Sequence, residues 1–134
     1  MERRTINPWT WQDPYGVAQG VEITGASRTL ICSGQISVDA DGQPLHVGDM
    51  KAQVKRALDN LETVLRRADM TFSDVVRLNA YTTDMEAFLA ELVEGGALFT
   101  RLKEARGCPV LTGVGVTRLA FLGLMIEIEA TAMK

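Results

Sequence analysis

Two carboxylates near the end of the chain, Glu127 and Glu129, have the residue type and spacing best suited to chemistry. They lie in the segment 124–133, where apolar and polar residues alternate. Alternation places side chains two apart on one face of a β-strand, so Glu127 and Glu129 are predicted to share a face. A carboxylate in a cleft with apolar neighbours can act as a general base toward water. The alternative is a structural role, with both carboxylates paired across the sheet or at a subunit interface.

The other side chains capable of nucleophilic or metal chemistry are few. Cys32 lies in an apolar run and is predicted to be a small buried hydrophobe. Cys108 is predicted to be a free loop thiol rather than a nucleophile, and His46, the single histidine, to be solvated in a turn. Two cysteines without CxxC spacing and one histidine supply too few soft ligands, so we expect no metal site.

Composition and charge exclude several classes of protein. A chain of 134 residues with 46% apolar and 23% charged residues is typical of one globular domain, taken as residues 1–134. The net charge of -3 argues against binding nucleic acid through its phosphates. No apolar stretch approaches the roughly 18 to 20 residues that span a bilayer, and the first residues contain no apolar signal region, so we expect a cytoplasmic protein without membrane contact.

Two helices are predicted to support the site. Apolar residues recur every three or four positions over residues 49–68, which predicts an amphipathic helix with Asp49 as its N-cap. A second helical pattern begins after Asp84 and continues to Leu102, but Gly95-Gly96 interrupts it. Each glycine costs about 1 kcal/mol relative to alanine inside a helix, so we expect a kink or break there.

The strands are predicted from alternation and from bounding turn residues. A hairpin is expected from residues 21–24 and 29–33, and further strands from residues 74–82, 110–116 and 124–133. The order of strands and helices predicts an α+β fold, a mixed β-sheet with two helices packed on one face. The other sheet face mixes polar and apolar residues, which suggests contact with another subunit.

Several motifs together resemble one family. In chain order they are Pro14-Tyr15, Ser33-Gly34-Gln35-Ile36, Asp49 with Ala52-Gln53 and Ala57-Leu58 with Asn60-Leu61, Asp74-Val75-Val76 through Thr83-Asp84-Met85 to Phe88, Pro109, and Ile126-Glu127-Ile128-Glu129-Ala130. This set resembles the Rid (YjgF) family of reactive-intermediate deaminases. The match runs from about Pro14 to Ala132, and its specificity comes from the order of the motifs rather than from any one of them.

The resemblance implies a single-domain chorismate-mutase-like fold and a homotrimer with small-molecule clefts between subunits. Archetypal members hydrolyse imines and enamines, such as 2-aminoacrylate, to 2-keto acids and ammonia without a metal or organic cofactor. By the resemblance, Glu127 orients or activates the attacking water. Tyr15 and Ser33 line the cleft, and Gly34 supplies backbone.

The chain departs from the family at the carboxylate-binding arginine. The family reads Pro-Ala-Arg-Ser-Cys-Val, whereas residues 109–114 here place Leu111 at the arginine position and Gly113 at the cysteine position. Leucine provides none of the charge-assisted hydrogen bonds of a guanidinium, worth about 1.5 to 3 kcal/mol each. We therefore expect small 2-imino acids to bind poorly in a more apolar cleft, with Thr112 or Ser33 replacing part of the lost polar contact.

Three functions follow from these observations. The first is a divergent deaminase acting on a larger, less anionic imine or enamine, with Glu127 as general base. The second is a non-catalytic module that binds a small apolar molecule or a partner protein. The third and weakest is an endoribonuclease or translation inhibitor, which the acidic balance disfavours. For Trp9, Trp11 and Tyr15 we favour packing that anchors the loop 8–16 over a wall of the ligand cleft.

Overall fold

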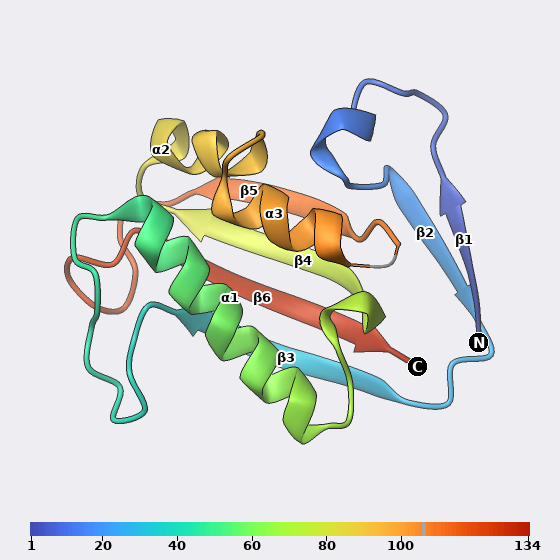
Figure 1. Ribbon diagram of the computed structural model, residues 1–134, viewed down its shortest axis with the longest axis horizontal. Helices are drawn as coiled ribbons and strands as arrows, with labels where there is room; N and C mark the ends of the chain where they lie inside the picture. Colours follow the sequence, from blue (N-terminus) through green and yellow to red (C-terminus); the bar gives the residue numbers. More distant parts are fainter. Residues whose placement is uncertain (106) are drawn as a thin grey trace.

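The computed structural model describes residues 1–105 and 107–134 (Figure 1). Its strands are β1 (Glu2–Ile6), β2 (Gly20–Thr24), β3 (Thr29–Ile36), β4 (Val75–Thr82), β5 (Val110–Gly115) and β6 (Ile126–Met133). Its α-helices are α1 (Met50–Arg67), α2 (Met85–Leu89) and α3 (Ala97–Glu104), with short 3₁₀ turns η1 (Asp13–Tyr15), η2 (Phe72–Asp74) and η3 (Ala90–Leu92).

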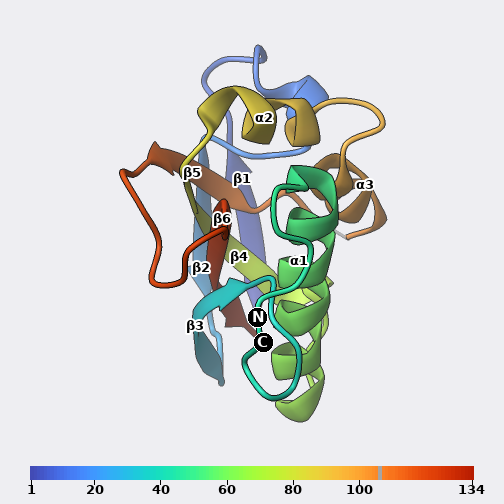
Figure 2. The same cartoon turned by 90° about the vertical axis from the view of Figure 1, so that its left-hand side faces the viewer.

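Four strands form a mixed sheet in the order β3-β6-β4-β5. β6 is antiparallel to both β3 and β4, whereas β4 and β5 are parallel. Helices α1 and α3 lie side by side on one face of this sheet, and no helix of the described chain covers the opposite face (Figure 2). The predicted α+β architecture, a mixed sheet with two helices on one face, is confirmed.

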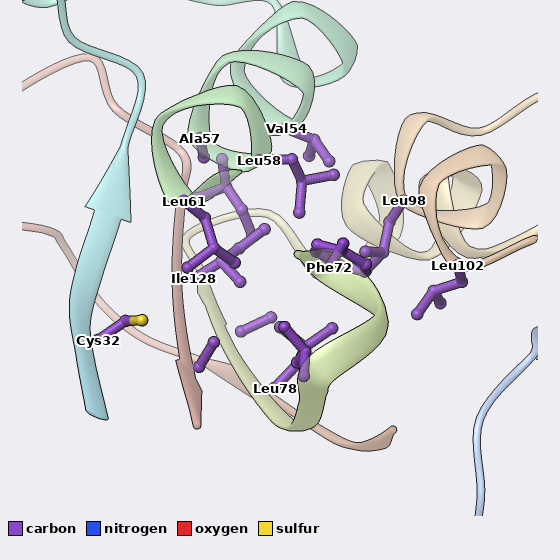
Figure 3. Close-up of a cluster of buried hydrophobic side chains, with 14 of the residues drawn as sticks. Cys32, Val54, Ala57, Leu58, Leu61, Phe72, Leu78, Leu98, Leu102 and Ile128 are labelled. Carbon is purple, nitrogen blue, oxygen red and sulfur yellow. The ribbon is translucent and has the colours of Figure 1, made fainter. Parts of the chain in front are cut away.

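The hydrophobic core lies between α1 and the sheet. The apolar stripe of α1 is buried, including Val54, Leu58 and Leu61, and it meets Leu78 of β4 and Ile128 of β6 (Figure 3). The predicted N-cap is present, since the Asp49 carboxylate accepts the Ala52 amide at 3.0 Å. Cys32 is buried at the edge of this cluster, as predicted, and burial raises the pKa of its thiol.

A buried amide joins α1 to the loop that precedes β6. Gln53 is fully buried, and its Nε2 donates to the carbonyl oxygens of His46 and Gly123, each at 3.0 Å. Its Oε1 accepts the Met125 amide at 2.7 Å. One side chain therefore satisfies three backbone groups and holds the start of β6 against the helix.

The second helical region is divided, as its two glycines predicted. Asp84 caps α2 by accepting the Ala87 amide at 3.1 Å, and the helix gives way to η3 before the break at Gly96. The buried Glu91 then accepts the Ala97 amide at 2.6 Å, so it caps the first turn of α3. A Cβ on Gly96 would collide with the Glu91 backbone, which explains glycine at this position.

The predicted hairpin between residues 21–24 and 29–33 is wrong. β2 pairs instead with β1, and β3 pairs with β6 at the far end of the chain. Alternation predicts that each segment is a strand but contains no information on its partner. Ala18, just before β2, forms a parallel bridge with Val110 at the start of β5, and this bridge links the N-terminal segment to the main sheet.

None of the described helices is both long enough and apolar enough to cross a membrane.

Candidate functional site

Glu127 lies on the sheet face that the helices leave open. Its neighbours Ile126 and Ile128 are fully buried under the helices, so the alternation of β6 directs Glu127 to the opposite side. In the sheet it lies across from Ile36 of β3 and Tyr81 of β4. The predicted placement of Glu127 and Glu129 on one face is confirmed.

Gly34 lies directly against the Glu127 carboxylate. The pairing of β3 with β6 shifts register between Cys32 and Gln35, so Ser33 and Gly34 form a β-bulge beside β6. A Cβ on Gly34 would collide with the carboxylate oxygen of Glu127 and lie 2.7 Å from its Cδ. Glycine is therefore required here by close approach, and the structure brings Ser33, Gly34 and Glu127 together.

The two carboxylates of β6 have different surroundings. Glu129 accepts hydrogen bonds from Asn79 Nδ2 at 2.9 Å and from the Tyr81 hydroxyl at 2.7 Å. These hydrogen bonds lower the pKa of Glu129, the one from Asn79 contributing most, and the same contact with Glu129 raises the pKa of Tyr81. The Glu127 carboxylate makes no hydrogen bond with any residue of the described chain. Glu129 therefore has the structural role that was the alternative for both carboxylates, paired across the sheet. The Glu127 carboxylate has no such partner in the described chain.

A second group of predicted residues lines a large hollow at the β5 edge of the sheet. The hollow has a volume of about 870 Å³, within the range of small-molecule sites. Tyr15, Leu111, Thr112 and Gly113 all lie on its wall. Phe88, Leu89 and Leu92 of the α2–η3 region supply much of the remaining apolar surface.

The N-terminal loop forms the outer wall of this hollow, but aromatic packing does not anchor it. Trp9 and Trp11 are 61% and 67% exposed, contrary to the packing role that we favoured from sequence. The buried Gln12 holds the loop instead, since its Nε2 donates to Trp9 O at 2.9 Å and its Oε1 accepts from Gln19 Nε2 at 3.1 Å. Trp11 lines the hollow, whereas Trp9 is absent from its wall.

A single chain does not assemble the complete predicted site. Tyr15, Leu111, Thr112 and Gly113 share the hollow, but Ser33, Gly34 and Glu127 are not among the described residues that line it. The two groups lie on different strands, one on β5 and its neighbouring loop, the other on β3 and β6.

Sequence reasoning missed three residues near these groups. Asn79 and Tyr81 hold Glu129, and Arg77 borders the large hollow. All three lie on the open face of β4, and only strand register could show which of them meets Glu129. No group of three metal-ligating side chains is found in residues 1–105 and 107–134.

Comparison with known proteins identifies relatives along almost the whole chain. A family model described as Endoribonuclease L-PSP matches residues 11–134. The chain is 34% identical over 103 residues to the RutC family protein YjgH of Escherichia coli, covering 77% of this chain and 73% of that protein. It is 33% identical over 120 residues to the protein DfrA of Myxococcus xanthus, covering 90% and 85%.

Solved structures agree with the sequence relatives. The chain superposes with a TM-score of 0.82 on YyfB of Yersinia pestis, described as a protein of unknown function of the conserved Rid protein family. That pair is 37% identical, with 100% of both chains covered. A putative endoribonuclease of Thermotoga maritima gives a TM-score of 0.62 at 28% identity, with 87% and 85% of the chains covered. The chain therefore belongs to the Rid (YjgF) family.

Proposed function

We propose that this protein is a homotrimer that binds a small molecule in clefts between subunits and hydrolyses a C=N bond there. In this reaction Glu127 takes a proton from water as the water adds to the imine carbon, and it returns that proton to the imine nitrogen. The tetrahedral adduct then loses ammonia as its hydroxyl proton moves to the nitrogen, which leaves a carbonyl compound. The observation that most supports the proposal is that the Glu127 carboxylate has no hydrogen-bond partner in the described chain. This carboxylate lies on the open sheet face against Gly34, whereas Glu129 is held by two hydrogen bonds.

The open sheet face supports assembly with other copies of the chain. Ile31 is 80% exposed and Val114 is 41% exposed, so this face presents apolar surface beside its polar residues. Exposed apolar surface of this kind is typical of protein interfaces. The separation of Glu127 from the hollow at β5 is explained if the cleft takes one wall from each of two subunits. Light scattering at micromolar concentration should give three times the mass of the chain.

Leu111 determines which imines fit this cleft poorly. Its side chain is half-buried and packs against the hydrophobic core, so it offers an apolar surface in the position where the family has an arginine. A small 2-imino acid would lose its main charged partner there. An imine or enamine with a larger apolar body instead gains contact with the hollow's wall.

Imines generated in place by an amino-acid oxidase test the proposal. Semicarbazide traps an imine in competition with its hydrolysis, so a hydrolase lowers the yield of semicarbazone. We expect little effect on 2-iminopropionate and a clear effect on the imine derived from phenylalanine. The Leu111→Arg variant should gain activity toward 2-iminopropionate; equal activity of both proteins on both imines would contradict the role of Leu111.

A paired substitution separates catalysis from folding. Glu127→Gln removes the base and keeps the shape of the side chain, so turnover should fall by at least about 100-fold while the trimer persists. Glu104→Gln changes an exposed carboxylate of α3 and should leave turnover unchanged. Full activity of Glu127→Gln would refute the general-base role.

A binding module without turnover is the second candidate. Leu111 favours it, because the residue that would orient an archetypal substrate is absent while the hollow itself is well formed. The two candidates differ in one result: a binding module should bind the keto acid product or its analogues but accelerate hydrolysis of neither imine.

A further inference from the structure

The hollow at the β5 edge contains an uneven distribution of charge. Its wall is formed mainly by apolar and neutral side chains, and Arg77 is the one charged residue among the described residues that line it. No carboxylate borders the hollow in the described part of the chain. A cationic side chain in such surroundings favours an anionic ligand.

The guanidinium of Arg77 has no partner within the described part of one chain. Arg77 projects from β4 on the open face and is exposed. Its guanidinium forms no salt bridge or hydrogen bond with another residue of ranges 1–105 and 107–134. Glu129 borders a smaller depression together with Arg77, and its carboxylate already accepts hydrogen bonds from Asn79 and Tyr81.

The neutral polar groups of the hollow are less available than Arg77. Gln12 and Gln19 are bonded to each other at 3.1 Å, and Gln12 also donates to Trp9 O and to Asp13 Oδ1. The hydroxyls of Tyr15 and Thr112 and the indole N–H of Trp11 are the remaining side-chain donors among the described residues of the wall. A carboxylate entering the hollow therefore finds one charged donor, two hydroxyls and one indole N–H.

The shape and chemistry of the walls indicate the rest of the ligand. Phe88, Leu92 and Leu111 form an apolar floor, and the exposed ring of Trp11 stands at the edge. Aromatic and branched groups bind such surfaces through area burial and ring contacts. We propose that Arg77 is the anion-binding residue of this hollow and that the hollow takes an organic anion with an aromatic or branched apolar body. This inference rests on the proposed function only in taking the hollow as a ligand site.

Arg77 thereby modifies the expectation drawn from Leu111. The loss of an arginine on β5 suggested a less anionic ligand, but a guanidinium on the adjacent strand β4 borders the same hollow. Its Cα partner across the β4–β5 pair is Val110, one residue before Leu111. A ligand that places its acid toward β4 would thus be oriented differently from an archetypal substrate.

Binding of a matched pair of probes tests the inference. The protein is titrated with 3-phenylpropionate and with its neutral analogue 3-phenylpropionamide, using calorimetry or ligand-observed NMR. The acid should bind about fivefold more tightly than the amide, because one partly solvated charge pair contributes about that factor. The preference should shrink when NaCl is raised to about 0.5 M, because the charge is exposed to salt.

Variants assign the preference to one side chain. Arg77→Gln should bind both probes equally, whereas Arg77→Lys should keep part of the preference because it retains charge but not the forked donor geometry. Arg66→Gln removes an exposed arginine of α1 outside the hollow and should behave as wild type. Circular dichroism and the trimer mass verify that each variant is folded.

The outcomes separate this inference from the proposed hydrolase. Equal binding of acid and amide by wild type, or an undiminished preference in Arg77→Gln, would overturn the role of Arg77. Backbone amide shifts of wild type with 3-phenylpropionate give a second measurement, and they should cluster on β5 and α2; shifts confined to other surfaces would also overturn it. A wild type that prefers the acid but hydrolyses no imine would refute the hydrolase and leave this inference standing.

Discussion

The close approach of Gly34 to Glu127 makes a sharp prediction for stability. A Cβ at position 34 would lie 2.7 Å from both Cγ and Cδ of Glu127, closer than real contacts allow. Overpacking costs typically 1 to 3 kcal/mol. Glu127 is only half-buried and can rotate away, so we expect Gly34→Ala to lower the free energy of unfolding by about 1 kcal/mol.

The effect of Gly34→Ala on the free energy of unfolding should change from destabilising to stabilising once Glu127 is truncated. Glu127→Ala removes the three atoms nearest to the new Cβ, which are the Cγ, Cδ and Oε1 atoms of Glu127. The backbone at Gly34 does not adopt a positive φ, so alanine fits there without strain. Alanine should then raise the free energy of unfolding by about 0.5 kcal/mol, because it reduces the conformational entropy of the unfolded chain. The double-mutant cycle therefore predicts a coupling energy of about 1.5 kcal/mol.

Urea unfolding of the four proteins measures this coupling. All curves are recorded at one protein concentration, because association stabilises a folded oligomer by mass action. Gly20→Ala is the matched control, since its Cβ would lie 3.6 Å from Ile6 Cβ and meet no Glu127 atom. If Gly34→Ala had the same effect with and without Glu127, within about 0.4 kcal/mol, the reasoning on close approach would be refuted.

Three further predictions concern residues that hold the framework of the site. Glu91→Ala should lower the free energy of unfolding by about 2 kcal/mol, because it removes the buried side chain that caps α3. The control Glu94→Ala changes an exposed carboxylate and should alter the same quantity by less than about 0.5 kcal/mol; urea unfolding measures both. Gln53→Leu should cost about 3 kcal/mol in the same assay, because it leaves three backbone groups without their partner; a cost below about 1 would contradict this. The depressed pKa of Glu129 means that the unfolded carboxyl binds its proton first as pH falls, so its stabilising contribution is present above the ordinary value of 4.5 and is lost below it. Tyr81→Phe removes one of the two hydrogen bonds to Glu129, so stability should fall less between pH 6 and pH 3 than in wild type. Urea-unfolding midpoints recorded over this pH range measure the difference.

Sequence patterns predicted the elements well where one face of a segment is buried. The alternation over β6 gave the correct inward and outward faces, because shifting a strand by one residue would expose its whole apolar set. The stripe and cap of α1 and the break at Gly96 were predicted for similarly local reasons. Such features depend on neighbours within a few residues along the chain.

Long-range pairing was not predictable in this way. The partner of β3 lies almost a hundred residues further along the chain, and nothing in the 29–36 segment specifies it. The same limit hid the role of Gly34, which follows from the register of β3 on β6, and the partners of Glu129, which follow from the register of β4 on β6. The resemblance proposed Gly34 as a backbone contributor, and the geometry adds that its missing side chain makes room for Glu127.

Mixed trimers test most directly the claim that Glu127 and the hollow act together across a subunit boundary. One parent is Glu127→Gln, which lacks the base, and the other is Thr112→Trp, which fills the hollow from an exposed position on its wall. In a cyclic trimer refolded from equal amounts of the two, about one cleft in four combines an intact hollow with an intact Glu127 from the neighbour. The account predicts imine hydrolysis at about a quarter of the wild-type rate in the mixture, with each parent inactive alone. A mixture no more active than its parents would contradict it.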